Sequence, residues 1–152
     1  MVKWVNNYMK QNIKQINKYI FLSFLGGILY VLCELVWRSW SHWTMFILGA
    51  ICFLYAGIQN EFISWNYPFW KQVLRTELFV LVSEFITGCI VNLWLGWNIW
   101  DYSSLKGNIL GQTSWQFALL FLPLCTIAII LDDYLRYWFF NEEKPRYNFK
   151  LK

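Results

Sequence analysis

Charged side chains are scarce in this sequence of 152 residues. Asp, Glu, Lys and Arg together make up 14% of the chain, whereas a soluble domain typically carries about 25%. Hydrophobic residues make up 58% of the chain and aromatic residues 22%, which is more apolar surface than the core of so short a chain can hold. The shortage of charge therefore argues against a soluble domain and predicts that lipid surrounds much of the molecule.

The chain also lacks the patterns of several common functions. Its formal net charge is only +4, and no run of basic residues stands among polar ones, so we expect no nucleic-acid partner. There is one histidine, and the four cysteines lie in separate apolar runs. This excludes a Cys/His set for zinc, and we expect no metal and no other cofactor. The stretch 107–114 has glycines but no GK[ST], and GxSxG and HExxH are absent from the sequence, so no catalytic residue is assigned.

What the sequence has instead is four apolar runs, each close to the roughly 20 residues that cross a bilayer. The runs cover residues 19–37, 43–61, 78–97 and 115–135. Pro123 interrupts the last run, which a membrane helix tolerates. In the connector 64–77, Pro68 breaks any helix that would continue from the second run. We therefore predict an all-α integral membrane protein, a four-transmembrane-helix bundle over residues 19–138, followed by a frayed cytoplasmic tail at 139–152.

Residues 1–18 form an amphipathic segment before the first run. Apolar and basic residues alternate at helical spacing with no acid among them: Val2, Val5, Met9, Ile13, Ile16 and Ile20, with Lys3, Lys10, Lys14 and Lys18 between. Such a helix lies in the headgroup plane of the membrane. The alternative is a solvated positive leader that only sets the topology.

The cations sort to one side of the four predicted spans. Of the thirteen Lys and Arg residues, only Arg38 and Lys106 fall in the two loops on the opposite side. Because the cytoplasmic side of a membrane protein carries the excess of Lys and Arg, we predict that both termini are cytoplasmic. Tryptophans mark both ends of the runs, as aromatic belts do.

The stretch from Glu84 to Gln112 is the most unusual part of the chain. Glu84, Gly88, Asn92 and Gly96 recur at four-residue intervals, which places them on one face of a helix. A long polar loop, residues 98–114, then joins spans three and four, where about 2–8 residues are usual in a bundle. We expect this loop to fold as a cap or a re-entrant turn.

Polar residues gather at the predicted outer ends of the spans. The candidate substrate-binding cluster consists of Glu34, Arg38, His42, Asn92, Asp101, Asn108 and Gln112. One interpretation is an outward-facing cavity for a substrate headgroup or solute, since ionisable groups within membranes are usually functional. The other is a hydrogen-bonded plug that positions the helices, in which Glu34 and Arg38 form a structural pair.

A second polar group lies at the predicted inner ends: Asn60, Glu61, Glu84, Asp132, Asp133 and Arg136. Glu84 is expected roughly 10 Å inside the inner boundary by the helix rise, where it must be protonated or paired. Glu84 is therefore an intramembrane ionisable residue that could serve as a proton or cation site, although nothing in the sequence names an ion. The other members are interpreted as solvated helix ends.

Three segments of the chain resemble a known family: ELVWRSWSHWTMF at 34–46, EFITGCIVNLWLGWNIWDYSSLKGNILGQ at 84–112, and DDYLRYW at 132–138. Together they are similar to the small bacterial membrane proteins called putative ABC-transporter type IV, or CmpB-type. The resemblance covers about residues 26–138. It implies a multi-pass protein of the bacterial cytoplasmic membrane with a transport-related role.

These observations lead to one functional prediction and two alternatives. The prediction is a permease-like or accessory membrane subunit that handles a small solute or lipid, with nucleotide hydrolysis supplied by a separate ATPase subunit. Four spans are too few to surround a wide pathway, so transport would require a homo-oligomer. The first alternative is a small membrane enzyme acting on a lipid-linked substrate at the outer leaflet. The second is a structural or assembly protein.

Overall fold

The computed structural model describes residues 2–150 and, within the first helix, the side chains of residue 9 and of residues 11 onward. Among the described residues, four helices are long and apolar enough to cross a membrane. The elements in chain order are α1 (Val2–Arg38), α2 (Trp43–Phe62), α3 (Phe69–Gly88), the π-helix η1 (Cys89–Trp94), β1 (Asn108–Ile109), β2 (Thr113–Ser114) and α4 (Trp115–Phe140). The predicted membrane protein with four apolar helices is confirmed.

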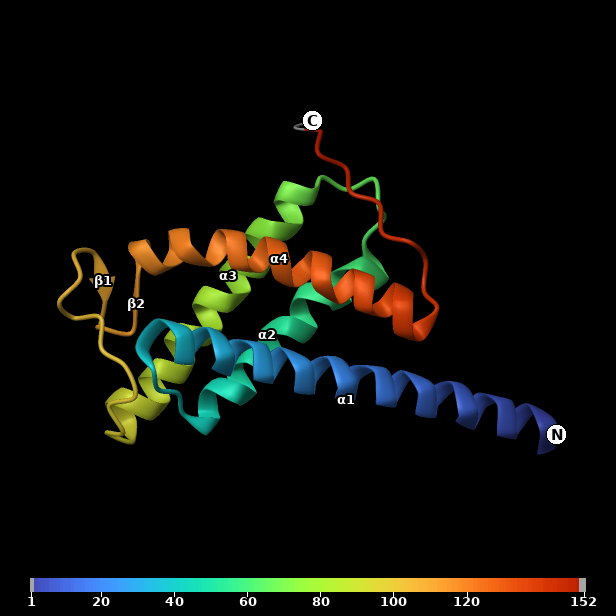
Figure 1. Ribbon diagram of the computed structural model, residues 1–152, viewed down its shortest axis with the longest axis horizontal. Coiled ribbons are helices and arrows are strands. Elements are labelled where there is room, and N and C mark those ends of the chain that lie inside the picture. The colour runs from blue at the N-terminus through green and yellow to red at the C-terminus, as the bar shows by residue number, and fades with distance from the viewer. Residues whose placement is uncertain (1, 151–152) are drawn as a thin grey trace.

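Helix α2 lies at the centre of the bundle and contacts α1, α3 and α4. Glycines allow the close approach of the helices, as small residues do in membrane bundles: Gly49 packs against Tyr30 of α1, and Gly26 of α1 packs against Phe53. The main core consists of buried apolar residues of α2, α3 and α4 together with Ile99 and Trp100 of the loop. The β1–β2 hairpin lies at the opposite end of the molecule from the amino terminus (Figure 1).

Helix α1 is continuous from Val2 to Arg38, so the predicted amphipathic segment and the first span are one helix. Residues 18–38 rise about 30 Å, which matches the hydrocarbon thickness of a bilayer. The amino-terminal part of α1 extends beyond the other helices (Figure 1), and Met9, Ile13 and Ile16 are about half exposed. Four side chains of the predicted amphipathic pattern lie outside the described residues, namely those of Val2, Lys3, Val5 and Lys10. The interfacial position of residues 1–18 stays a prediction.

Helix α3 begins at Phe69, earlier than the predicted start at residue 78. Pro68 precedes the helix as its N-cap, with a φ of −58°, and a proline at a helix start loses no intrahelical hydrogen bond. The predicted break between the second and third runs is present, because α2 ends at Phe62 and α3 begins directly after Pro68. The same span ends at Trp94, before Gly96, which takes a φ of +68° outside the helix.

The loop between η1 and α4 folds back onto the bundle. Strands β1 and β2 pair antiparallel, with Asn108 opposite Ser114. Gln112, Thr113 and Ser114 are all buried, and β2 contacts both α3 and α4. The described loop ends in a short hairpin packed against α3 and α4. Its role as a cap or a re-entrant turn stays a prediction.

The tail is ordered over residues 141–150, unlike the frayed tail expected from its charge. Helix α4 ends where Asn141 adopts a left-handed conformation with a φ of 58°, a common way for helices to end. The tail then crosses the connector before α3, where the carbonyl of Asn148 accepts a hydrogen bond from the backbone N–H of Phe69 at 2.8 Å. The ring of Tyr147 packs against that of Phe69, with centroids 4.7 Å apart. Lys152 lies outside the described residues.

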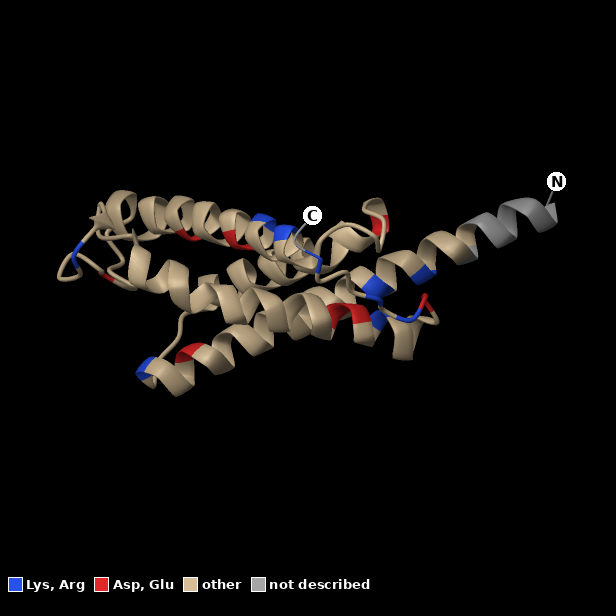
Figure 2. Ribbon diagram, turned by 90° about the horizontal axis from the view of Figure 1, so that it is seen from above, with Lys and Arg blue, Asp and Glu red and all other residues tan. Residues whose placement is uncertain are grey.

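Lys and Arg are concentrated toward the end of the molecule where α1 begins and the tail folds, with few at the hairpin end (Figure 2). This is the sorting expected from the sequence. We call the end with Lys18, the connector and the tail the inner end, and the end with the hairpin the outer end. Their orientation in the cell stays a prediction.

Candidate functional site

At the outer end, Glu34 and Arg38 form the predicted pair on α1. The Arg38 Nη2 donates to Glu34 Oε1 at 2.7 Å, and the second carboxylate oxygen accepts from the Ser41 hydroxyl at 2.6 Å. The Arg38 Nη1 donates to the carbonyl of Ile99 at 2.6 Å. Arg38 thus joins the end of α1 to the beginning of the long loop, while its Nε has no partner among the described residues.

Asn92 and Gln112 hold the hairpin against η1. The Asn92 side chain donates to Gln112 Oε1 at 2.7 Å and accepts from the backbone N–H of Ile99 at 2.6 Å. Gly88 lies one turn earlier on the same face, where an added Cβ would meet the Gln112 side chain. The predicted face of Glu84, Gly88 and Asn92 therefore receives the loop.

Glu84 belongs with this outer group, and its placement near the inner ends is wrong. Its two carboxylate oxygens accept hydrogen bonds from the Tyr102 hydroxyl at 3.3 Å and the Thr113 hydroxyl at 3.2 Å, both from the loop. The error in the predicted position of Glu84 follows from the start of α3. Because the helix begins at Phe69, Glu84 lies more than four turns beyond its first residue and close to the loop. Burial raises the pKa of Tyr102 well above its ordinary value, and the neighbouring Glu84 carboxylate contributes to this shift.

His42, Asp101 and Asn108 have local partners. His42 caps α2 through Thr44. Asn108 donates to the carbonyl of Leu105 at 2.7 Å within the loop. Asp101 accepts from the backbone N–H and the hydroxyl of Ser103, both at 2.8 Å, and these bonds hold the pKa of its carboxyl below the ordinary value.

The outer cluster thus divides into small groups that connect neighbouring segments. Glu34, His42 and Asp101, which the enzyme alternative needs together, each bond to a residue of their own segment. The contacts favour the interpretation of the cluster as a hydrogen-bonded plug. Its role in binding a substrate stays a prediction.

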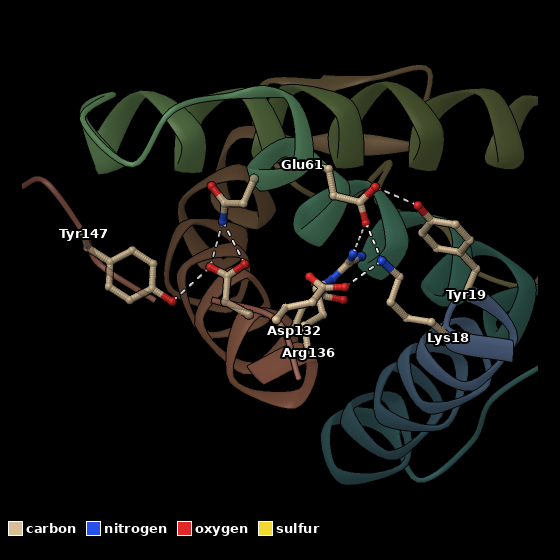
Figure 3. A network of polar contacts seen from close by, with 9 residues as sticks. Lys18, Tyr19, Glu61, Asp132, Arg136 and Tyr147 are labelled. Atoms are coloured by element: carbon tan, nitrogen blue, oxygen red, sulfur yellow. Dashed lines mark hydrogen bonds and ion pairs between the residues drawn. The ribbon is translucent and has the colours of Figure 1, made fainter. Parts of the chain in front are cut away.

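The inner end carries an ionic network that joins α1, α2, α4 and the tail, in which the cations and Asp132 are buried while Glu61 and Glu142 are partly exposed. Lys18 donates to Glu61 at 2.9 Å and to Glu142 at 2.7 Å. Arg136 pairs with Asp132 one turn earlier on α4 and with Glu61. Figure 3 shows Lys18, Tyr19 and Arg136 converging on Glu61, with Tyr147 reaching in from the other side.

This network corrects the interpretation of the inner residues as solvated helix ends. Lys18 is 3% exposed, Asp132 0% and Arg136 2%, although charged residues are almost never fully buried unless paired. Sequence reasoning did not include Lys18 and Glu142, because their partners are 43 and 124 residues away in the chain. The feature of the sequence that could have indicated the buried position of Lys18 is its place at the edge of the first apolar run.

Asp133 lies beside this network but has a different set of partners. Its two oxygens accept from Asn60 Nδ2 at 2.8 and 2.7 Å, and one of them also accepts from the Tyr147 hydroxyl at 3.0 Å. The pKa of Tyr147 is raised well above its ordinary value by burial and by the adjacent Asp133 carboxylate. Asp133 is 3% exposed, yet neutral groups supply all its hydrogen bonds in the described part of the chain.

A cavity of about 410 Å³ opens between these two groups. Its lining includes Asn60, Glu61, Trp65, Asp133, Arg136 and Glu142. Two buried polar atoms of the lining have no hydrogen-bond partner among the described residues, namely Asn60 Oδ1 and Arg136 Nη2. The candidate functional site is therefore this inner cavity.

A comparison with protein families matches residues 2–147 to the family described as "Putative ABC-transporter type IV". The chain belongs to this family. No curated protein and no solved structure is similar enough to the chain to match it. Membership in the CmpB-type family, together with the four apolar helices, supports a transport-related membrane protein with several spans. The family match also includes the tail as far as Tyr147, so it covers the residues of the inner cavity.

Proposed function

We propose that the protein is a permease-like or accessory subunit of a membrane transporter and that the inner cavity binds the small solute or lipid it handles. The observation that carries this proposal is the cavity itself, which lies beside a partly buried ionic network and is lined by the charged residues Glu61, Asp133 and Arg136. Ionisable groups within membrane helices usually mark a pathway or binding site.

Two buried polar atoms beside the cavity have no hydrogen-bond partner among the described residues, and an unmade hydrogen bond in a buried site costs about 1–3 kcal/mol. Arg136 uses Nε for Asp132 and Nη1 for Glu61 and leaves Nη2 free. Asn60 Nδ2 donates to both carboxylate oxygens of Asp133, whereas Asn60 Oδ1 has no partner among the described residues. Both atoms are closed off from the cavity, so support for a binding site comes from the cavity and the charged side chains that line it.

The proposal assigns the energy source to a separate ATPase subunit, since the sequence has no phosphate-binding loop. The connector before α3 and the tail lie together at the inner end, so they are the surface that such a subunit would contact. A homo-oligomer would supply the remaining wall of a pathway that four spans cannot enclose.

Inside-out membrane vesicles from the native host provide the test. Vesicles with wild-type protein, with no protein, and with Asp133→Asn are incubated with the solute pool of the host, with and without ATP, and their contents are compared by mass spectrometry. We expect a solute or lipid whose amount in the vesicles depends on both the protein and ATP. The ATP-dependent change in that amount should be at least fivefold smaller with Asp133→Asn than with the wild type.

Lys106→Gln is the control, because it removes one charge from an exposed loop residue that belongs to neither polar cluster and should behave as wild type. Identical contents in vesicles with and without the protein would overturn the transport role.

A further inference from the structure

We propose that Glu84 is a proton-binding site at the outer end, and that the bound proton keeps the loop of residues 98–114 packed against the bundle. When Glu84 loses the proton, the loop loosens. Glu84 lies at the opposite end of the molecule from the inner cavity, so this proton site does not depend on the transport role proposed above. The observation behind it is a buried carboxyl group whose described hydrogen-bond partners are neutral and come from the loop.

Glu84 is buried within a helix that is apolar enough to cross a membrane. Its side chain is 2% exposed, and it lies in the candidate span Phe69–Trp94. An ionised carboxylate in such a place is strongly unfavourable unless a cation pairs with it. The ion pairs of the described residues involve Lys18, Arg38 and Arg136, and none of them includes Glu84. The carboxyl group is therefore more stable when it carries a proton.

The titratable groups around Glu84 supply no counter-charge. They are Tyr30 and Glu34 of α1, Cys52 of α2 with Cys125 of α4 behind it, and Tyr102 of the loop. Glu34 is a second carboxylate, which repels a negative charge on Glu84. Arg38 lies near Tyr102, but it is paired with Glu34 at 2.7 Å and donates to the carbonyl of Ile99. Its charge is thus already balanced by Glu34.

The hydrogen bonds of Glu84 have the lengths of bonds to a neutral group. Its Oε1 lies 3.3 Å from the Tyr102 hydroxyl and its Oε2 lies 3.2 Å from the Thr113 hydroxyl. Hydroxyl groups that donate to an ionised carboxylate typically lie about 2.5–2.7 Å from it. A hydroxyl can donate or accept, so a protonated Glu84 can donate to Thr113 while it accepts from Tyr102. The neutral form therefore uses both contacts.

A proton on Glu84 acts on the loop because both of these partners belong to the loop. The Tyr102 ring also stacks on Phe117 of α4, with centroids 4.1 Å apart, and Thr113 is buried in β2. An ionised Glu84 requires water, which reaches the carboxylate when Tyr102 and Thr113 move away. The bonds of Asn92 to Gln112 and to the backbone of Ile99 do not involve Glu84, so the loop loosens without detaching.

A proton fits this site better than a metal ion. The described residues contain no group of three or more His, Cys, Asp or Glu side chains that could hold a metal. Glu84 meets only the hydroxyls of Tyr102 and Thr113 in the described part of the chain, whereas hard cations such as calcium usually take about six or more oxygen ligands.

Backbone amide exchange of the full-length protein in nanodiscs tests the effect on the loop at pH 6 and pH 9, with correction for the intrinsic effect of pH on exchange. In the wild type, exchange in residues 98–114 should be at least tenfold faster at pH 9 than at pH 6. Glu84→Gln keeps the shape of the side chain and stays neutral, so its loop should remain protected at both pH values. Glu77→Gln is the matched control, because Glu77 is a buried acid about two turns earlier on α3, and it should respond as wild type.

Infrared spectroscopy tests the proton on Glu84 directly. At pH 6 the wild type should show the carbonyl band of a protonated carboxyl group that is absent from Glu84→Gln and is lost from the wild type at pH 9. Tyr102→Phe removes one hydrogen bond to this group and should shift the band. Thermal unfolding of each variant establishes that it is folded. If Glu84→Gln does not fold, the band in the wild type and its shift in Tyr102→Phe decide the matter.

Three results of the exchange experiment would overturn the proton site. A loop equally protected at both pH values in the wild type would show that no proton controls it. Equal loosening at pH 9 in the wild type and in folded Glu84→Gln would assign the response to another group, such as Glu34 or Tyr102. A loop already loosened in Glu84→Gln at pH 6 would mean that the ionised carboxylate holds it. Protection restored at pH 9 by sodium but not by choline would show that a metal cation occupies the site.

Discussion

Tyr147 shows how a single side chain connects the tail to the candidate site. Its hydroxyl donates to the Asp133 carboxylate at 3.0 Å, and its ring packs on Phe69 and Trp65. The hydrogen bond is one of three that the buried carboxylate receives from the described residues. At the scale of residues, the tail is therefore held by the same carboxylate that lines the cavity.

Tyr147→Phe should loosen the tail while keeping its ring contacts. Loss of a hydrogen bond to a charged group should lower the free energy of local opening by about 1.5–3 kcal/mol. Backbone amide exchange in residues 141–150, followed by mass spectrometry at pH 7, should therefore become at least tenfold faster. Tyr137→Phe is the matched control, because Tyr137 is exposed on α4. Unchanged exchange in Tyr147→Phe would show that the hydrogen bond does not hold the tail.

Helices α2 and α4 approach one another closely at Gly57. An added Cβ at this position would overlap the Asp132 carboxylate, which pairs with Arg136 on the same helix. Gly57 also lines the inner cavity. At the scale of elements, a glycine on one helix thus makes room for the ion pair on another.

Gly57→Ala should destabilise the protein by about 1–3 kcal/mol, the usual cost of an extra methyl group in a packed core. The Asp132 side chain would have to move, and the Arg136 pair would move with it. Thermal unfolding in detergent measures the effect, with Ile51→Val on the exposed face of α2 as the control. A melting temperature equal to that of wild type would mean that α2 and α4 are not in this contact.

For the whole molecule, the four helices bring the tail and Lys18 of α1 to the same end. Lys18 pairs with Glu142 across 124 residues of sequence, and the connector before α3 pairs with the tail. The Lys and Arg residues concentrate at this end (Figure 2). Since Lys and Arg are in excess on the cytoplasmic side of membrane proteins, the inner end should face the cytoplasm.

Reporter fusions test this orientation. Green fluorescent protein, which folds in the cytoplasm, should be fluorescent when fused to either end of the full-length chain. Alkaline phosphatase, which is active only after export, should be active when inserted at Gly107 in the loop at the outer end. Phosphatase activity of a fusion at either terminus would contradict the predicted orientation.

The sequence alone was sufficient to predict the lipid environment, the four apolar helices and the common face of Glu84, Gly88 and Asn92. These properties depend on composition and on helical periodicity, which are local. The pairing of Glu34 with Arg38 could also be predicted, because residues four apart meet on any helix. The start of α3 was missed because Pro68 can either interrupt a helix or precede one.

Only the tertiary structure decided where the buried charges meet. Lys18, Glu61, Arg136 and Glu142 are distant in sequence and become neighbours because four helices and a folded tail converge at one end. Their separate positions look like ordinary charged helix ends, so local patterns could not distinguish a buried network from a solvated one. The same holds for the cavity, which exists because the packed helices leave space beside Asp133 and Arg136.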